Sequence, residues 1–183
     1  MLHDESKCWQ KGEKKVNFYN DNLKEAKKEQ VEKEKLLTVV KTEECPWENS
    51  KQGKIKHLVH KKMGTQMKSI EAYMQILSPG GKSGKHKHMA EEVIYILEGK
   101  GYDLHWDTEV ELKDKYYWKI SENPKKFEWE EGDVIYIPVN TVHQHFNANP
   151  DKIARFISAI NPIYKFLGYN DLEQVEDAPE YKE

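Results

Sequence analysis

The segment GGKSGKHKHMAEEVIYILEG, residues 80–99, combines turn-forming glycines, two closely spaced histidines and a strongly β-forming run. Alternate side chains on an extended strand point to the same face, so His86 and His88 can face one side together. Glu92 follows at another even offset and opens the run EVIYIL, which is rich in β-branched and aromatic residues. The segment therefore predicts strands that carry two imidazoles and one carboxylate on a shared face.

A second segment, GDVIYIPVNTVHQHFN at residues 132–147, predicts another hairpin and supplies His143. Three imidazoles and one carboxylate form a mixed nitrogen and oxygen donor set. Such a set suits Fe(II), Mn(II), Ni(II), Co(II), Cu(II) or Zn(II), whereas Ca(II) prefers oxygen ligands alone. We therefore predict one divalent transition metal on His86, His88, Glu92 and His143, with two positions of an octahedral ion left for other ligands.

These residues resemble the two motifs of the cupin superfamily. Gly80, His86, His88, Glu92 and Gly99 fit the first motif, G-x5-H-x-H-x3-E-x6-G, at every spacing. The second, G-x5-P-x-G-x2-H-x3-N, is matched by Gly132, Pro138, His143 and Asn147. Asn140 stands where the family has glycine, and asparagine tolerates the left-handed backbone expected there. The resemblance covers about residues 66–163 and implies a jelly-roll barrel with a bound metal.

The rest of the central region also favours an all-β fold. Short β-forming runs separated by turn residues are typical of an antiparallel sandwich or barrel. Further strands are predicted at residues 55–59, 69–77, 102–106, 116–120, 126–129, 134–137, 144–147 and 153–160. With no repeat in the sequence, we predict a single cupin barrel over residues 53–165.

The two ends of the chain have a different composition. Residues 1–16 are polar and are predicted to be loose, and a helix over 21–38 is predicted with Asp21 as its cap. We assign residues 1–52, including a linker near Cys45–Ser50, to a polar N-terminal extension. Residues 166–183 are assigned to an acidic tail or short helix. The N-terminal helix could lie on the barrel or reach across a homodimer.

The composition excludes several classes of function. The formal charge is −3, and the lysines near the N-terminus alternate with glutamates, so a nucleic-acid partner is not expected. No stretch approaches the roughly 18 apolar residues of a membrane span. The only cysteines, Cys8 and Cys45, and the absence of a signal-peptide pattern favour a reducing, cytoplasmic setting.

Two further residues are candidates for a direct role in catalysis. His145 follows His143 by two and can share its inward face, as an outer-shell donor or a substrate contact. Arg155, the only arginine, can clamp a substrate carboxylate if it points inward, although a surface ion pair is the favoured alternative. His57, His60 and His105 are interpreted as ordinary polar residues.

The resemblance is specific for fold and metal and less so for reaction. The single barrel is similar to small cupin dioxygenases, which implies an Fe(II)-dependent dioxygenase acting on a small aromatic or dicarbonyl substrate. The alternatives are a non-oxidative isomerase, lyase or decarboxylase, in which the metal acts as a Lewis acid, and a cupin that binds a ligand or metal without catalysis.

Overall fold

A computed structural model of the 183-residue chain describes residues 16–169 and 172–183. Almost all of the segment predicted to be loose, residues 1–16, lies outside the described residues. The chain divides between Leu36 and Leu37 into an N-terminal unit and a barrel unit. Among the described residues, no helix is both long and apolar enough to cross a membrane.

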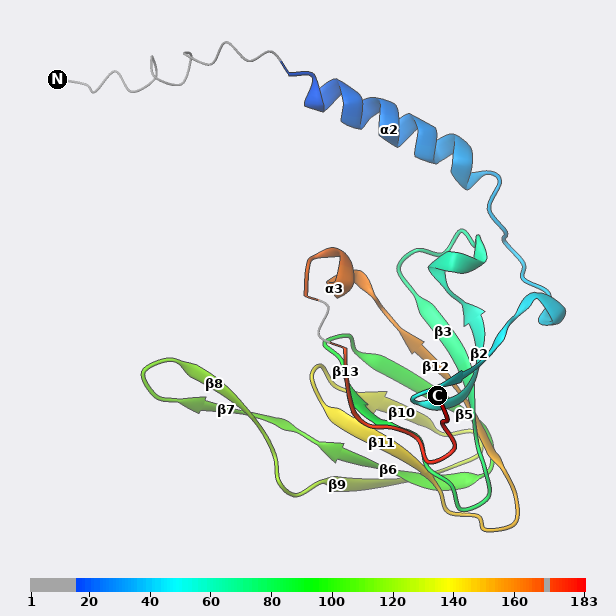
Figure 1. The fold of residues 1–183 in the computed structure, drawn as a ribbon, viewed down its shortest axis with the longest axis vertical. Helices are drawn as coiled ribbons and strands as arrows, with labels where there is room; N and C mark the ends of the chain where they lie inside the picture. The colour runs from blue at the N-terminus through cyan, green and yellow to red at the C-terminus, as the bar shows by residue number, and fades with distance from the viewer. Residues whose placement is uncertain (1–15, 170–171) are drawn as a thin grey trace. The chain divides into compact units, whose positions relative to one another are not determined.

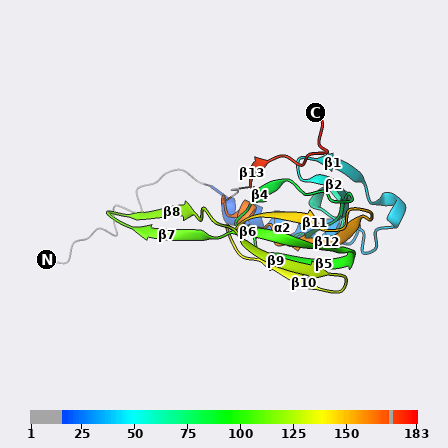
Figure 2. The same cartoon turned by 90° about the horizontal axis from the view of Figure 1, so that it is seen from below.

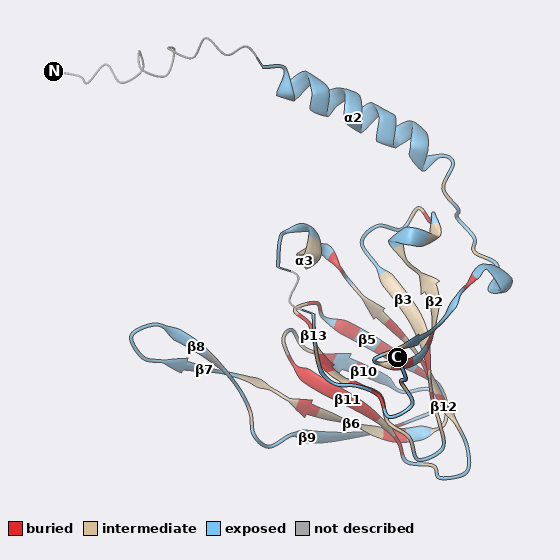
Figure 3. Cartoon of the chain, viewed as in Figure 1, coloured by how far each residue is buried: buried red, intermediate tan, exposed pale blue. Residues whose placement is uncertain are grey.

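The N-terminal unit contains the predicted helix with different ends. Helix α2 spans Phe18–Lys33 and follows Asn17, so Asp21 lies in its first turn and the prediction that Asp21 caps the helix was wrong. A carboxylate in the first turn still interacts favourably with the helix dipole. No residue of α2 is buried, as Figure 3 shows, and Leu37 lies beyond its end.

The barrel unit is built from antiparallel strands in two main sheets, which face each other in Figures 1 and 2. The six-stranded sheet has the order β1 (Trp47–Ser50), β2 (Gly53–Val59), β3 (Glu71–Leu77), β12 (Ala154–Ile160), β5 (Glu92–Glu98) and β10 (Val134–Ile137). The five-stranded sheet has the order β13 (Glu173–Glu176), β4 (Lys85–Lys87), β11 (Val142–Asn147), β6 (Lys100–Trp106) and β9 (Lys125–Glu130). This arrangement is the predicted jelly-roll barrel.

The remaining elements are short. Strands β7 (Thr108–Leu112) and β8 (Tyr116–Ile120) form a separate hairpin that extends from the barrel in Figure 2. The described part of the chain has two short 3₁₀ turns: Thr42–Glu44 precedes β1, and Lys61–Met63 follows β2. Helix α3 covers Ile163–Phe166 and follows β12 in the chain.

The predicted strands are present, but three others were missed. The segment expected to be a linker contains β1, which pairs with β2. The segment expected to be a tail or helix contains β13, which pairs with β4 beside His86. Strand β7 was missed as the partner of β8. These strands are mostly exposed, so their sequences lack the apolar alternation by which the others were recognised.

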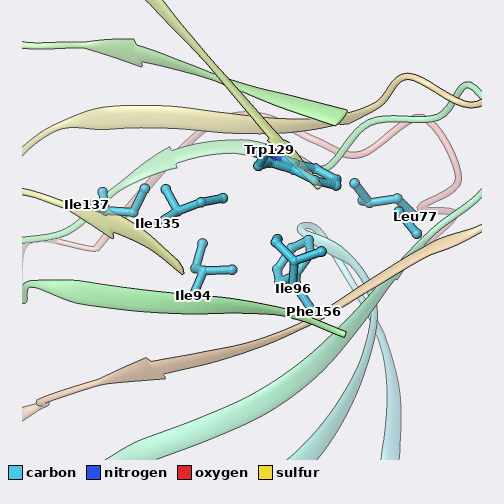
Figure 4. Packing of buried hydrophobic residues seen from close by; sticks show 8 residues of the cluster. Leu77, Ile94, Ile96, Trp129, Ile135, Ile137 and Phe156 are labelled. Carbon is cyan, nitrogen blue, oxygen red and sulfur yellow. The ribbon is translucent and has the colours of Figure 1, made fainter. Parts of the chain in front are cut away.

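The apolar core fills one part of the barrel interior. Strand β5 shows how it forms, because Ile94 and Ile96 are buried while the alternate residues Val93 and Tyr95 are exposed. Figure 4 shows the cluster, which consists of Leu77, Ile94, Ile96, Trp129, Ile135, Ile137, Ala154 and Phe156. Glu92, one of the four predicted metal ligands, lies on the same inward face as Ile94 and Ile96. Strand β5 therefore connects the apolar core with the predicted metal site.

Two turns require unusual backbone angles. Asn140 has φ of 59°, the left-handed conformation predicted from the motif, and its amide donates to the carbonyl of His88 at 3.0 Å. Gly99, between β5 and β6, has φ of +95°, and a Cβ there would lie 2.9 Å from the Cβ of Ala154. The turn at Asn140 precedes β11, which carries His143, and the turn at Gly99 follows β5, which carries Glu92. Both turns therefore position strands that carry predicted metal ligands.

Candidate metal centre

Four polar side chains converge inside the barrel, where apolar residues would otherwise be expected. One potential ligand atom from each of His86, His88, Glu92 and His143 lies within 4.8 Å of all the others, and all four residues are buried. His86 on β4 and His143 on β11 are direct cross-strand partners. Glu92 comes from β5 in the opposite sheet, so the group joins the two sheets.

The Glu92 carboxylate is held from both sides. Its Oε2 lies 3.0 Å from Nε2 of His88 and 3.2 Å from Nε2 of His143. Its Oε1 accepts hydrogen bonds from the Tyr73 hydroxyl at 3.1 Å and from the Ser158 hydroxyl. The two hydroxyls therefore orient the carboxylate so that Oε2 points at the histidines.

The hydrogen bonds of two histidines define which nitrogen faces the centre. Nδ1 of His88 lies 2.7 Å from the carbonyl oxygen of Ala90, and Nδ1 of His143 lies 2.9 Å from that of Thr141. A carbonyl can only accept, so each Nδ1 carries the proton and donates it, which leaves the Nε2 lone pair toward the centre. This is the outer-shell arrangement that typically orients metal-binding histidines.

His86 gives an independent test of whether a metal fits. Among the described residues, neither of its ring nitrogens has a hydrogen-bond partner, although His86 is only 1% exposed. A buried polar group without a partner costs about 1–3 kcal/mol, and a metal ion at the centre would remove that cost. The donors therefore fit a divalent transition metal, with Glu92 as the single anionic ligand.

The electrostatics keep the four residues in ligand form. Burial raises the pKa of Glu92, but the close approach of the His143 and His88 rings outweighs it and holds that pKa well below the ordinary value. Burial lowers the pKa of His86 strongly, and the neighbouring His143 lowers it further. Burial also lowers the pKa of His143. The result is an ionised Glu92 carboxylate beside the neutral imidazoles of His86 and His143.

A cavity of about 430 Å³ opens onto this group. His86 and His88 line it, together with Tyr73, whose hydroxyl also contacts Glu92. Other parts of its wall are apolar or aromatic and come from β2, β12, α3 and the segments after β4 and before β13: Ile55, Val59, Met89, Ala90, Ile160, Pro162, Tyr164, Tyr169 and Leu172. A small organic molecule can therefore reach the candidate ligands from the cavity.

A second polar cluster lines the same cavity away from the metal ligands. Glu71 Oε2 lies 3.1 Å from Nζ of Lys165 on α3, and Glu71 Oε1 lies 3.6 Å from Nε2 of His60. Nδ1 of His60 accepts from the Lys62 amide at 3.1 Å, so Nε2 carries the proton that faces Glu71. We call Glu71, Lys165 and His60 the rim cluster.

His145, a predicted catalytic residue, lies deeper in the barrel. Its Nδ1 is 2.9 Å from Oδ2 of Asp103, and its ring packs against Phe156 with centroids 5.0 Å apart. Trp129 donates to the other oxygen of Asp103 at 2.8 Å. His145 is buried and does not line the cavity, so its position favours the outer-shell role over substrate contact.

Arg155, the other predicted catalytic residue, does not reach the cavity. Its Nε donates to Oε2 of Glu98 at 2.7 Å, and Nη2 lies 2.5 Å from the same oxygen. The side chain is 42% exposed. The expectation that Arg155 clamps a substrate is therefore corrected to the alternative, an ion pair at the surface. Inward and outward positions alternate on β12, and Arg155 falls between buried Ala154 and Phe156.

Sequence reasoning missed most of the cavity wall. His57 and His60 were interpreted as ordinary residues, yet both line the cavity. Glu71 and Lys165 were not singled out, since charged residues are common throughout this chain. His105 was also interpreted as ordinary, but it is buried beside His143 and Asp103. The even spacing of Glu71 and Tyr73 on one strand was the available signal, because it places both on one face.

Comparison with known sequences gives a consistent family. A family model described as "Auxin binding protein" matches residues 30–182. The auxin-binding protein T85 of Nicotiana tabacum is 29% identical over 117 residues, which cover 63% of this chain and 59% of that protein. An uncharacterized protein of Methanocaldococcus jannaschii is 32% identical over 93 residues, covering 49% of this chain and 58% of that protein. The chain thus spans less than two thirds of these curated relatives.

Solved structures show the same fold at lower identity. An oxalate decarboxylase of Lactobacillus farciminis, solved as a formate complex, aligns with a TM-score of 0.55 and 20% identity over 73% of this chain and 34% of that one. A salicylate 1,2-dioxygenase from Pseudoaminobacter salicylatoxidans, solved with gentisate, gives a TM-score of 0.50 and 14% identity over 66% and 28%. At these identities the likeness establishes the barrel alone.

Proposed function

Because this chain belongs to the auxin-binding protein family of the cupin superfamily, we propose that it binds a small organic acid at a divalent metal ion in its barrel. The observation that carries the proposal is the cavity of about 430 Å³, whose wall includes His86 and His88. The acid occupies this cavity, and the metal is held by those two histidines together with Glu92 and His143.

The charge balance of the centre supports an anionic ligand. Glu92 is the only carboxylate of the four donors, so a divalent ion there keeps a net positive charge. The aromatic and apolar wall suits the carbon skeleton of the acid, while its carboxylate oxygens are good donors to a divalent ion. The relatives named as auxin-binding proteins support this ligand class.

The proposed metal is Fe(II) or Mn(II), with Ni(II), Zn(II), Co(II) and Cu(II) as competitors for the same donors. When bound, the ion supplies Lewis acidity toward a ligand oxygen. The chain's own residues do the rest. Tyr73 and Ser158 hold the Glu92 carboxylate in place, and the carbonyls of Ala90 and Thr141 fix the rings of His88 and His143.

Titration of the purified protein with organic acids tests this proposal. Metal-loaded protein is expected to bind indole-3-acetate, salicylate or oxalate by calorimetry, and metal-free protein is expected to bind none of them. The His143→Ala variant should behave like metal-free protein. The Glu128→Gln variant is the matched control, because Glu128 is exposed and away from this cavity. Equal acid binding with and without metal would refute the proposal.

A second candidate is an Fe(II)-dependent dioxygenase that acts on a small aromatic or dicarbonyl substrate. The observation that favours it is the presence of three tyrosines, Tyr73, Tyr164 and Tyr169, in the wall of the cavity that His86 and His88 also line. O₂ consumption by the Fe(II)-loaded protein with gentisate, catechol or a β-diketone is the test. Turnover of an acid without O₂ consumption would instead favour the isomerase, lyase or decarboxylase alternative.

We also propose that the protein acts as a homodimer. The exposed apolar side chains of the β7–β8 hairpin, such as Leu112 and Tyr116, support self-association. Light scattering coupled to size-exclusion chromatography measures the mass in solution. A mass equal to that of a single chain at micromolar concentration would rule the dimer out.

A further inference from the structure

The metal ligands account for only part of the polar lining of the cavity. Its wall also includes Ser50, Lys51, Gln52, His57, Gln174 and the rim cluster, whose Glu71, Lys165 and His60 contact one another. We call the wall at His86 and His88 the metal end and the wall at the rim cluster the rim end. We propose that the rim cluster binds a neutral polar group of the ligand, so that the protein selects acids with a distal hydroxyl or amide. This inference rests on the proposed function, because it assumes that the acid group of the ligand occupies the metal end.

The geometry of β3 connects the two ends. Tyr73 and Glu71 are alternate residues on the strand and both line the cavity, and Tyr73 touches Glu92 of the metal centre. Residues two apart on a strand are separated by about 6.5–7 Å. The distance from the Tyr73 position to the Glu71 position is therefore about the length of a benzene ring with its substituents. Ile160 of β12 pairs with both Glu71 of β3 and Glu92 of β5, so the backbones of these two residues are two strand spacings, about 9.5 Å, apart. We infer that a substituted benzene ring can reach from one side chain to the other.

The charge of the rim cluster determines which distal group it prefers. The Glu71 carboxylate and the Lys165 ammonium form an ion pair, and Glu71 is the more buried partner, with its side chain 12% exposed against 34% for Lys165. Burial lowers the pKa of His60, which keeps that ring neutral. The cluster therefore has no net charge, and it offers both a donor and an acceptor.

A second carboxylate on the ligand fits this cluster poorly. It would approach Glu71, which is held in place by Lys165 and His60, and the two like charges would repel each other in a partly buried site. A hydroxyl can accept from Lys165 and donate to Glu71 with no such repulsion. Two other basic side chains of the wall are already paired: His57 lies 2.5 Å from Glu48 and Lys51 lies 3.2 Å from Asp177, so neither adds an unpaired cation.

Three probes of matched shape test the inference on the full-length, metal-loaded protein. Phenylacetate has only the acid group, 4-hydroxyphenylacetate adds a hydroxyl, and 4-carboxyphenylacetate adds a second carboxylate. One hydrogen bond contributes a few-fold to tenfold in affinity, so 4-hydroxyphenylacetate is expected to bind about fivefold more tightly than phenylacetate. We expect 4-carboxyphenylacetate to bind most weakly of the three.

The Glu71→Gln variant provides the most discriminating test, because the substitution removes the negative charge of the Glu71 side chain and keeps its shape. In this variant 4-carboxyphenylacetate should gain about tenfold relative to phenylacetate, because Lys165 becomes available to an anion. Adding Lys165→Met should abolish that gain. Glu128→Gln is again the matched control and should leave the ranking unchanged. Circular dichroism and metal content check that each variant is folded and loaded.

The outcomes separate the two proposals. If phenylacetate binds in a metal-dependent manner but the hydroxyl adds nothing, or Glu71→Gln leaves the ranking unchanged, this inference is wrong and the proposed function stands. If none of the three acids binds the metal-loaded protein, both are overturned. A hydroxyl preference that is lost in Glu71→Gln, together with the gain for 4-carboxyphenylacetate, supports the inference.

Discussion

The interior of this barrel has a metal end and a core end, and the same strands supply both. Strand β5 contributes Glu92 to the metal end and Ile94 and Ile96 to the core end. Strand β12 contributes Ser158 to the first and Phe156 to the second. Side chains alternate between the two faces of a strand, so all of these residues face inward. The two ends differ because the inward residues are polar at one end of each strand and apolar at the other.

The two ends also differ in the partners that their buried side chains require. At the core end the residues need only contact one another. At the metal end the buried polar groups need hydrogen-bond partners or a metal, and several ring nitrogens, including both of His86, have no hydrogen-bond partner in the part of the chain that the structure describes. A change at the core end should therefore reduce stability, while a change at the metal end should reduce metal affinity. Each of the predictions below tests that division.

The largest expected effect is the loss of the metal in the His143→Ala variant. Removing an outer partner of a metal ligand costs about 10- to 100-fold in affinity, and removing a ligand itself should cost more. Elemental analysis of the purified variant should show the metal content falling from about one ion per chain toward zero. His57→Ala, on the cavity wall but outside the candidate ligand group, should keep its metal. Unchanged metal content in His143→Ala would disprove the ligand assignment.

The next effect is on stability and belongs to the core end. Phe156→Ala removes one of the largest fully buried side chains and should lower the free energy of unfolding by about 3–5 kcal/mol. Urea denaturation of the metal-free protein measures this change. The fraction that remains folded should bind metal with nearly normal affinity. A large loss of metal affinity in the folded variant would show that the two ends are coupled.

A smaller effect is expected from Asp103, which lies between the two ends. Burial raises the pKa of this carboxyl, but His145, His105 and Trp129 together hold it well below the ordinary value. A carboxyl with a lowered pKa stabilises the fold above its unfolded pKa of about 3.9, and the contribution is lost as the pH falls through the folded pKa. Asp103→Asn should therefore cost about 1.5–3 kcal/mol near pH 5.

The same substitution has a defined pH signature. The stability difference between the wild type and Asp103→Asn should shrink as the pH falls below about 4, because the unfolded wild type then takes up a proton that the folded state, with its lower pKa at Asp103, does not. Thermal unfolding of the metal-free proteins between pH 3 and pH 6 measures this difference. A constant difference over that range would mean that the charge of Asp103 does not contribute.

The smallest effect tests the orientation of Glu92. Ser158→Ala and Tyr73→Phe each remove one hydroxyl that donates to Oε1 of Glu92. Each should weaken metal binding by about tenfold, the lower part of the range for outer partners of a metal ligand. Competition with a chelator measures the affinity. If both single variants bind the metal as tightly as the wild type, the histidines alone must fix the carboxylate.

The metal end was predictable from the sequence to an unusual degree. The spacing of His86, His88 and Glu92 identifies a shared strand face, and the second motif brings His143 beside them. Even the left-handed backbone of Asn140 follows from its place in the motif. The spacings within each motif are local, because each depends on residues a few positions apart, whereas the approach of His143 to His86 is a long-range contact that followed from the family resemblance.

The cavity wall could not be predicted in the same way. Glu71 and Lys165 are far apart in sequence and meet only because α3 follows β12, which pairs with β3. The inward or outward direction of Arg155 depended on the phase of β12, which the sequence left open. The same limitation applies to β13, whose exposed residues lack an apolar pattern. Long-range pairing, rather than local propensity, decides these features.

The pairing of β13 with β4 has a consequence for the order of events during synthesis. Strand β4, which carries His86, lies between β11 and β13, and both partners follow it at a considerable distance along the chain. A ribosome that has released β4 and β5 has therefore delivered three of the four candidate ligands, but not the strands that hold them in place. The metal end is completed only when these later strands emerge, so stable insertion of the ion is expected only after β11 and β13 have left the ribosome.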